Sequence, residues 1–322
     1  MQTTVVGSYP RVSDAPDGQR LRRAIARWEP KEISREDLRA VQVDVLHEVV
    51  REQAAAGIDV VTDGQVTWYD PVSQFAAKLD GFEIGPLERY FDTNTYYRQP
   101  RAVGPIRWRT PMIADDFREA AKATSGPVKA VLTGPYTLAA MSAGGPSDDL
   151  VMQLAEALGR EVEALAAAGA THIQIDEPAF VRAKAFPKMY GHLAGLLLKR
   201  KGRARTTIFI AFGGVGPFLE DLLMLPFDVV GLDLVQGAGT LEALRAADTD
   251  KGIAFGLLDA RNTKLEDPKV VAKTVASFRD RIPLDRSYLC PSNGLEFLPR
   301  TRARQKLEVL VAAAKLVTEV AG

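Results

Sequence analysis

The chain has 322 residues, of which 46% are hydrophobic and 25% are charged, as expected for a globular protein with one large domain or two ordinary ones. Lysine plus arginine equals aspartate plus glutamate at 41 each, and this balance argues against nucleic acid as a main partner. The single cysteine, Cys290, excludes an intramolecular disulfide framework, and the sequence shows no signal peptide and no apolar run of membrane-spanning length, so we expect a cytoplasmic protein without a membrane partner.

Short strands and helices alternate along the whole chain. Strands are expected at 3–6, 58–61, 128–132, the stretch ending at Asp176, 206–210, 229–232, 253–258 and 287–289, and the clearest helices at 35–56, 148–168 and 301–320. Eight strand–helix units predict an α/β protein of the (β/α)8 TIM-barrel class, with residues 1–322 forming a single domain. A doubly wound sheet is the alternative, but no G-x-G-x-x-G motif follows the first strand.

Residues 79–112 interrupt this alternation with a long segment rich in aromatic residues, arginine and proline. In a barrel, such a segment is expected to be an inserted hairpin or lid at the active face. Its aromatic and arginine side chains would suit stacking on a flat, pterin-like ring. The alternative is a hairpin whose aromatic residues pack on the rim of the barrel.

Asp176 and Glu177 end an apolar stretch of β-branched residues and are followed by Pro178, so they stand where a strand stops. In α/β barrels, ligands bind at the carboxyl ends of the strands. Two carboxylates at such a place are costly unless they pair with or bind something. Either they serve function, or one of them caps the next helix or pairs with an arginine.

Polar residues and glycines recur after nearly every expected strand. They are Gly7-Ser8, Asp63-Gly64-Gln65, Thr133-Gly134-Pro135, Asp176-Glu177, 211–214, Asp233, 259–262 and 291–294. In a barrel these positions converge on one mouth, which predicts a composite polar site. Turn geometry alone accounts for each single glycine, so the prediction depends on the barrel.

The same residues resemble the cobalamin-independent methionine synthase family in its single-barrel form. The matching segments are 6–11, 92–94 with Tyr97, 132–135, 174–179, 256–262 and 291–299, and they follow the family order across nearly the whole chain. The resemblance implies a (β/α)8 barrel. It also implies methyl transfer from a methylated folate or another methyl carrier to homocysteine or a related thiol or amino-acid acceptor.

The resemblance further implies a zinc ion that binds the acceptor thiol as thiolate, with His, Cys, Glu and Cys ligands after the fifth, sixth and eighth strands. The corresponding positions here are Ala211, Gly213, Asp233 and Asn293. Alanine and glycine have no coordinating side chain and asparagine is a weak zinc ligand, so we do not expect the usual zinc site. Asp233 and Cys290 are weak candidates for a rearranged one. The three histidines, His47, His172 and His192, show no metal-ligand spacing.

The resemblance also assigns roles to individual positions. Gly7, Ser8 and Asp176 match positions that hold the carboxylate and amino group of homocysteine, and Gln65 stands where a glutamate would bind the amino group. We therefore expect substrate binding by Gly7, Ser8, Gln65, Asp176, Glu177 and Asn293, catalysis by Asp176, Asp259 and Arg261, and donor binding by Asp92, Asn94, Tyr97 and Trp108.

Three functions remain open at this point. The first is a metal-free methyltransferase acting on a small-molecule substrate. The second is a non-catalytic or accessory barrel, similar to the metal-free half of two-barrel methionine synthases, that acts beside a separate catalytic barrel or presents a methyl-carrier protein. Segments 92–94, 231–235 and 259–262 resemble that half as much as the catalytic half. The third is a zinc methyltransferase with rearranged ligands.

Overall fold

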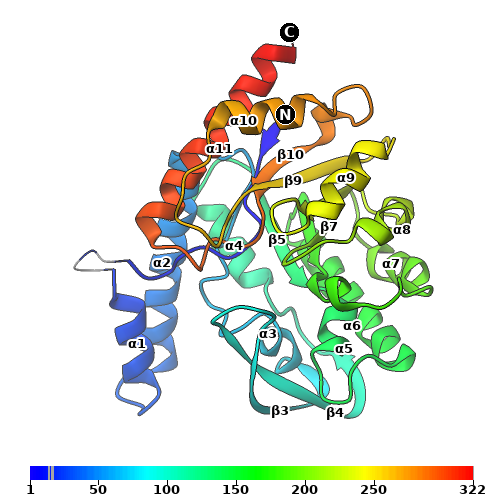
Figure 1. Cartoon of the computed structure of the whole chain (residues 1–322). Coiled ribbons are helices and arrows are strands. Elements are labelled where there is room, and N and C mark those ends of the chain that lie inside the picture. Colours follow the sequence, from blue (N-terminus) through cyan, green and yellow to red (C-terminus); the bar gives the residue numbers. More distant parts are fainter. Residues whose placement is uncertain (14, 16–17, 322) are drawn as a thin grey trace.

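The computed structural model describes residues 1–13, 15 and 18–321 (Figure 1). Within them, a sheet of parallel strands has the order β1-β10-β9-β8-β7-β6-β5-β2. The strands are β1 (Gln2–Thr3), β2 (Val61–Thr62), β5 (Val128–Thr133), β6 (His172–Asp176), β7 (Arg205–Ile210), β8 (Val229–Asp233), β9 (Gly252–Leu258) and β10 (Tyr288–Pro291). A parallel bridge between Thr4 and Val60 joins the two edges into a ring. The predicted barrel is confirmed, and the doubly wound alternative is wrong.

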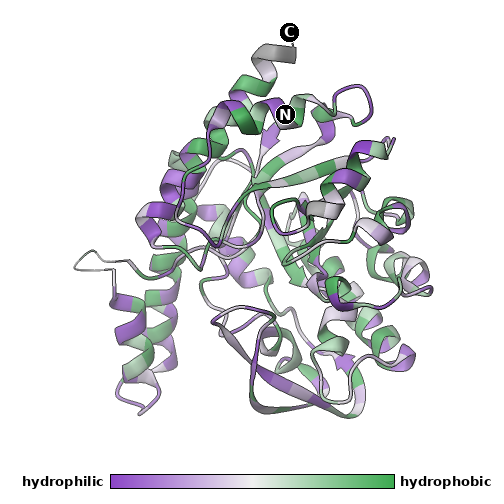
Figure 2. Cartoon of the chain, viewed as in Figure 1, coloured by the Kyte–Doolittle hydropathy of each residue, from purple (hydrophilic) through white to green (hydrophobic). Residues whose placement is uncertain are grey.

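Helices cover the outside of this ring, with their hydrophobic faces toward the strands (Figures 1 and 2). They are α1 (Arg20–Trp28), α2 (Arg35–Ala55), α3 (Ser73–Ala76), α4 (Ala114–Lys122), α5 (Pro135–Ala140), α6 (Asp148–Ala167), α7 (Tyr190–Leu198), α8 (Leu219–Met224), α9 (Ala238–Ala246), α10 (Pro268–Ala276) and α11 (Arg300–Ala321). Short 3-10 turns lie at Pro178–Arg182, Gly216–Phe218 and Leu284–Arg286. Ser34 and Asp37 form a capping box at the start of α2.

The inserted segment is an antiparallel hairpin of β3 (Leu79–Arg89) and β4 (Tyr96–Trp108), as expected from its composition. Its strands leave the barrel beside α3, and the tip between them, residues 90–95, returns over the mouth (Figure 1). The hairpin therefore contributes one wall of the site.

Two hydrophobic clusters fill the molecule. The larger lies between the sheet and the helices. The smaller contains Val6, Val60, Phe209, Ala211, Val229, Ala254, Tyr288 and Cys290 and lies inside the ring of strands. Gly231 is required beside it, because a Cβ at this position would lie 2.1 Å from the ring of Phe209. No helix in the described part of the chain has the length and apolar character that a membrane span needs.

Candidate active site at the barrel mouth

A cavity of about 340 Å³ opens where β1 and β2 end. Its wall combines residues from the two strand-end loops, the hairpin tip and the loop after β10, including Ser8, Arg11, Gln65, Trp68, Tyr90 and Glu296. A larger groove of about 580 Å³ lies outside the barrel between β4 and α6 and contains no residue from the carboxyl ends of the barrel strands. We therefore place the candidate site in the smaller cavity, which we call the mouth cavity.

Gly7, Ser8 and Gln65 come together at this cavity. A Cβ on Gly7 would lie 2.6 Å from Gln65 Nε2, so the backbone at Gly7 faces the Gln65 amide closely and glycine is needed there. Ser8 Oγ donates to Glu296 Oε2 at 2.5 Å. Gln65 itself is held in the left-handed region at φ 52° and its backbone N–H donates to Asp63 Oδ1 at 2.9 Å. Ser8 and Gln65 thus share one wall of the cavity, and Gly7 packs against the Gln65 amide.

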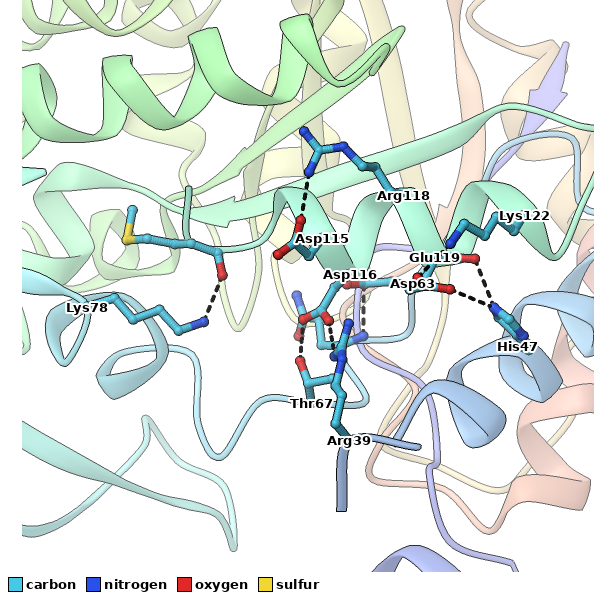
Figure 3. Close-up of polar contacts among 12 residues, drawn as sticks. Arg39, His47, Asp63, Thr67, Lys78, Asp115, Asp116, Arg118, Glu119 and Lys122 are labelled. Carbon is cyan, nitrogen blue, oxygen red and sulfur yellow. Dashed lines mark hydrogen bonds and ion pairs between the residues drawn. The ribbon is translucent and has the colours of Figure 1, made fainter. Parts of the chain in front are cut away.

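The loop that carries Gln65 is anchored to two outer helices (Figure 3). Thr67 Oγ1 donates to Asp116 Oδ2 of α4 at 2.6 Å, and Arg39 of α2 pairs with the other oxygen of the same carboxylate. Burial, reinforced by the charge of Asp116, raises the pKa of Asp63 to about 7. His47 lies beside this cluster on α2 and bonds the carbonyl oxygen of Glu119 in α4 at 3.1 Å, which gives it a structural contact between the two helices.

Asp176 is the last residue of β6; it is half-buried beside the mouth cavity and is not one of the residues that line it. Its Oδ1 accepts a hydrogen bond from Gln174 Nε2 at 2.7 Å, and Gln174 also donates to the Val6 carbonyl oxygen, next to Gly7. Burial raises the pKa of Asp176 to about 7, while the hydrogen bond from Gln174 and the charge of Lys129 oppose that rise. A carboxyl with this pKa exchanges its proton near neutrality.

Glu177 has a different role from its neighbour. Its side chain has no exposed area and accepts hydrogen bonds from the N–H groups of Tyr136 and Thr137, from Thr137 Oγ1 and from the Tyr190 hydroxyl, at 2.6–3.0 Å. It therefore satisfies the first N–H groups of α5, where a negative charge is favourable. Both carboxylate oxygens are thus engaged by α5 and by Tyr190 of α7, so the capping alternative describes Glu177 in this structure. A contact between Glu177 and substrate stays a prediction.

The positions expected for zinc do not form a metal site. Asp233 is 1% exposed, and its carboxylate accepts from the backbone N–H groups of Val235, Gln236 and Phe212 at 2.9–3.1 Å. Burial raises its pKa to about 6. Asn293 is also 1% exposed, so it does not reach the mouth cavity as the expected substrate contact. With Ala211 and Gly213 beside them, these side chains do not suit zinc.

Cys290 does not complete a rearranged site. It is fully buried in the cluster inside the ring, and this burial raises the pKa of its thiol to about 12. Metals bind the thiolate, which this environment disfavours. Among the described residues, no group of three or more His, Cys, Asp and Glu side chains has the arrangement of a metal site. His172 contacts the ring of Tyr288 and His192 is exposed on α7.

Asp259 and Arg261 lie on the loop after β9, two strands from β1 in the ring, and neither lines the mouth cavity. Asp259 Oδ1 accepts from the Arg261 backbone N–H at 2.9 Å. The exposed Arg261 guanidinium donates to Gln236 Oε1 at 3.3 Å and to the Asp92 carbonyl oxygen. In this structure Arg261 therefore ties the hairpin tip to the loop after β8.

The four residues expected to bind a donor are not brought together. Tyr97 is 4% exposed and donates to the Met141 carbonyl oxygen at 3.1 Å, whereas Trp108 donates to Glu161 Oε2 at 2.7 Å at the base of the hairpin. Asp92 and Asn94 are exposed at the tip. The rim-packing alternative describes most of the aromatic residues, because Tyr90 and Phe91 contact Phe212 of the loop after β7.

Sequence reasoning missed the cavity residue Glu296 and the buried Lys129. Glu296 lies three residues after Asn293 within a segment already noted, so its proximity to the site was the available signal. Lys129 stands in the otherwise mostly apolar strand β5, and a lysine in such a strand is itself unusual. The cavity also includes Tyr96, which is 57% exposed, and Tyr90, whose pKa is raised chiefly by burial and then by Asp176 and Glu296.

Comparison with known proteins gives consistent matches over the full chain. Residues 1–316 match the family described as "Cobalamin-independent synthase, Catalytic domain". A methionine synthase of Saccharolobus solfataricus is 33% identical over 99% of this chain and 95% of that protein. One of Thermococcus kodakarensis is 28% identical over 98% and 93%.

Solved structures share the fold. A B12-independent methionine synthase from Shewanella sp. W3-18-1, solved in complex with selenomethionine, superposes with a TM-score of 0.80 at 24% identity and covers 99% of this chain and 98% of that one. A putative vitamin-B12-independent methionine synthase from Listeria monocytogenes superposes with a TM-score of 0.77 at 21% identity, covering 100% and 99%.

Proposed function

Because this chain belongs to the cobalamin-independent synthase family, whose matched relatives are methionine synthases and therefore methyltransferases, we propose that its mouth cavity binds homocysteine or a closely related amino-acid acceptor for methylation. The observation that carries the proposal is the meeting of Gly7, Ser8 and Gln65 at one cavity, with Asp176 linked to the same backbone through Gln174. The Shewanella relative binds selenomethionine, which has the chemistry of a methylated product.

Each residue has a role that follows from its chemistry. Asp176 and Gln65 bind the ammonium group of the amino acid, because a carboxylate and an amide oxygen both accept hydrogen bonds. Ser8 Oγ and the backbone beside Gly7 bind its carboxylate. Glu296 keeps Ser8 oriented through their 2.5 Å hydrogen bond until the ligand arrives.

The acceptor thiol must lose its proton before it attacks a methyl group. The residues at the family's zinc positions do not suit the metal, so we derive no step through it. We assign the proton instead to Asp259, because the free oxygen of Asp176 is taken by the ammonium group. Arg261, on the same loop after β9, balances the charge of the donor.

The donor is a methylated folate or another methyl carrier that approaches past the hairpin tip, where Tyr96 offers an exposed ring. A second candidate function is an accessory barrel that binds the same amino acid and works with a separate catalytic barrel or a methyl-carrier protein. The observation that favours it is the absence of coordinating side chains at Ala211 and Gly213. We place either activity in the cytoplasm, since the one cysteine is a buried thiol.

The test combines elemental analysis, binding and turnover on the untagged protein. Calorimetry with L-homocysteine and L-methionine is expected to show binding, and methyl transfer from a methylated folate is expected to persist in the presence of a chelator. Binding without turnover from any donor would favour the accessory barrel. One zinc per chain, lost in Cys290→Ser or Asp233→Asn, would contradict the metal-free site, and no binding of either amino acid would overturn both functions.

A further inference from the structure

Lys129 is a charged residue buried inside the barrel. It is 5% exposed, and its ammonium donates to the Val5 carbonyl oxygen and to Gln174 Oε1, each at 2.6 Å. A buried ammonium is costly unless it is hydrogen-bonded and its charge is balanced. Both of its acceptors are neutral, so the negative charge that balances the ammonium must come from a carboxylate beyond them.

Gln174 connects Lys129 to that carboxylate. Its Oε1 faces the lysine, and its Nε2 donates to the Val6 carbonyl oxygen and to Asp176 Oδ1, each at 2.7 Å. The reverse orientation would place the amide NH₂ against the ammonium and the amide oxygen against two other oxygens. The surroundings therefore fix one orientation of the amide. Its oxygen, the negative end of the amide dipole, faces the ammonium, and its NH₂ group, the positive end, faces the carboxylate.

Negative groups otherwise surround Asp176. Glu177 follows it directly after the end of β6 and Glu296 approaches from the loop after β10, and both raise its pKa. The buried Tyr90 ring closes the side toward the hairpin tip. Lys129 supplies the opposing positive charge up to about pH 8, because burial lowers the pKa of its ammonium to about 8.

On the other side of the lysine, the two titratable groups that face it are neutral near pH 7. Cys290 has a pKa of about 12 because it is buried, and His172 has a pKa of about 4 because burial and the charges of Lys129 and Arg205 lower it. Neither group balances the ammonium. The carboxylate that balances the Lys129 ammonium is therefore Asp176, to which Gln174 connects it by hydrogen bonds.

We propose that Lys129 is a positioning residue for the mouth cavity, which acts through Gln174 to orient the Asp176 carboxylate and keep it anionic for an ammonium-bearing ligand. Asp176 Oδ1 is held by Gln174, and Oδ2 has no hydrogen bond among the described residues, so this oxygen is the one presented to the ligand. The identity of the ligand rests on the proposed function. The coupling between Lys129 and Asp176 does not.

The first test is the pH dependence of L-methionine binding, measured by calorimetry between pH 5.5 and 8.5. In the wild type, affinity falls as pH drops through the pKa of Asp176, because the protonated carboxyl no longer attracts an ammonium. Lys129→Met is expected to move this midpoint upward by about one pH unit, which weakens binding about fivefold at pH 7. Lys315→Met, the same change at an exposed site on α11, is expected to match the wild type. An unmoved midpoint in Lys129→Met overturns the proposal.

The second test needs no ligand and covers the case in which Lys129→Met folds poorly. Removing the lysine alone leaves a buried carboxylate without its counter-charge, whereas Lys129→Met with Asp176→Asn removes both charges. The double variant is expected to unfold at a higher urea concentration than Lys129→Met. If the losses of stability in Lys129→Met and in Asp176→Asn add up to the loss in the double variant, the two residues are not coupled. If the wild type binds neither methionine nor homocysteine, the proposed function fails, while this cycle still decides the role of Lys129.

Discussion

The two halves of the barrel mouth use their polar residues in opposite ways. In the half formed by Ser8, Gln65 and Asp176, which we call the binding half, side chains line or adjoin a cavity and Asp176 keeps one oxygen free. In the half formed by Phe212, Asp233 and Asn293, the closed half, the Asp233 carboxylate accepts from three backbone N–H groups. Asn293 Oδ1 has no hydrogen-bond partner among the described residues, but the side chain is buried away from the cavity. Strand-end position alone therefore does not make a ligand site. A site also needs open acceptors that a ligand can reach.

The strongest test of this contrast is Asp176→Asn. The substitution keeps the shape of the side chain and removes the charge that attracts an ammonium, so we expect methionine affinity to fall about 100-fold at pH 7.5. Calorimetry measures the change, and Asp115→Asn on the exposed face of α4 serves as the matched control. Equal affinity in wild type and Asp176→Asn would remove this residue from the site.

In the closed half, we expect a substitution to lower the stability of the protein and to leave ligand binding unchanged. Asp233→Ala leaves three backbone N–H groups without their acceptor, so we expect the free energy of unfolding to drop by about 2–3 kcal/mol. Urea denaturation gives this value, and methionine affinity of the folded protein should stay as in the wild type. Unchanged stability together with weakened binding would show that Asp233 faces a ligand.

The third prediction concerns the pH dependence of stability. Burial raises the pKa values of Asp63, Asp176 and Glu177 to about 7, above their ordinary values of 3.8, 3.8 and 4.5, so folding favours the protonated carboxyls. Their stabilising contribution is complete below about pH 4 and is lost as pH rises through about 7. We expect the wild type to resist urea better at pH 5.5 than at pH 8, and Asp63→Asn to reduce that difference by on the order of 1 kcal/mol. A difference of the opposite sign would contradict the raised pKa values.

The smallest effect is expected at Arg261, which ties the hairpin tip to the loop after β8. Arg261→Ala removes an exposed side chain that contacts Asp92 and Gln236, so stability should change by at most about 0.5–1 kcal/mol. The hairpin tip, residues 90–95, should nevertheless exchange its amide hydrogens faster. Mass spectrometry of peptides from the tip measures this rate, and a rate equal to that of the wild type would mean that Arg261 does not hold the tip.

Much of the fold was predictable because the strands are short, apolar and separated by clear turns. The stretch ending at Asp176 was placed within a residue. Within the site, the meeting of Gly7, Ser8 and Gln65 followed from the barrel. The different roles of the adjacent carboxylates Asp176 and Glu177 could not be predicted in this way, because the role of Glu177 depends on α5 lying against it.

The remaining errors share a physical cause. Trp108 and Tyr97 have side chains that suit stacking, and only the path of the hairpin shows that their polar atoms are bonded to Glu161 and to the Met141 carbonyl. The importance of Lys129 likewise comes from a partner 45 positions away in the chain. Such pairings are set by tertiary contacts, and hydrophobic periodicity contains no information about them.

The joint between β1 and β2 sets the spacing of two cavity residues. These short strands meet at one isolated bridge, from Thr4 to Val60. Threonine side chains reinforce this joint: Thr4 Oγ1 donates to the Val60 carbonyl oxygen at 2.7 Å, and Thr62 Oγ1 donates to the Gly7 carbonyl oxygen at 2.6 Å. Ser8 and Gln65 follow the two strands, one on each side of the joint. Hydroxyl groups thus fasten the ring where its backbone ladder is shortest, and they hold the two walls of the pocket at a fixed separation.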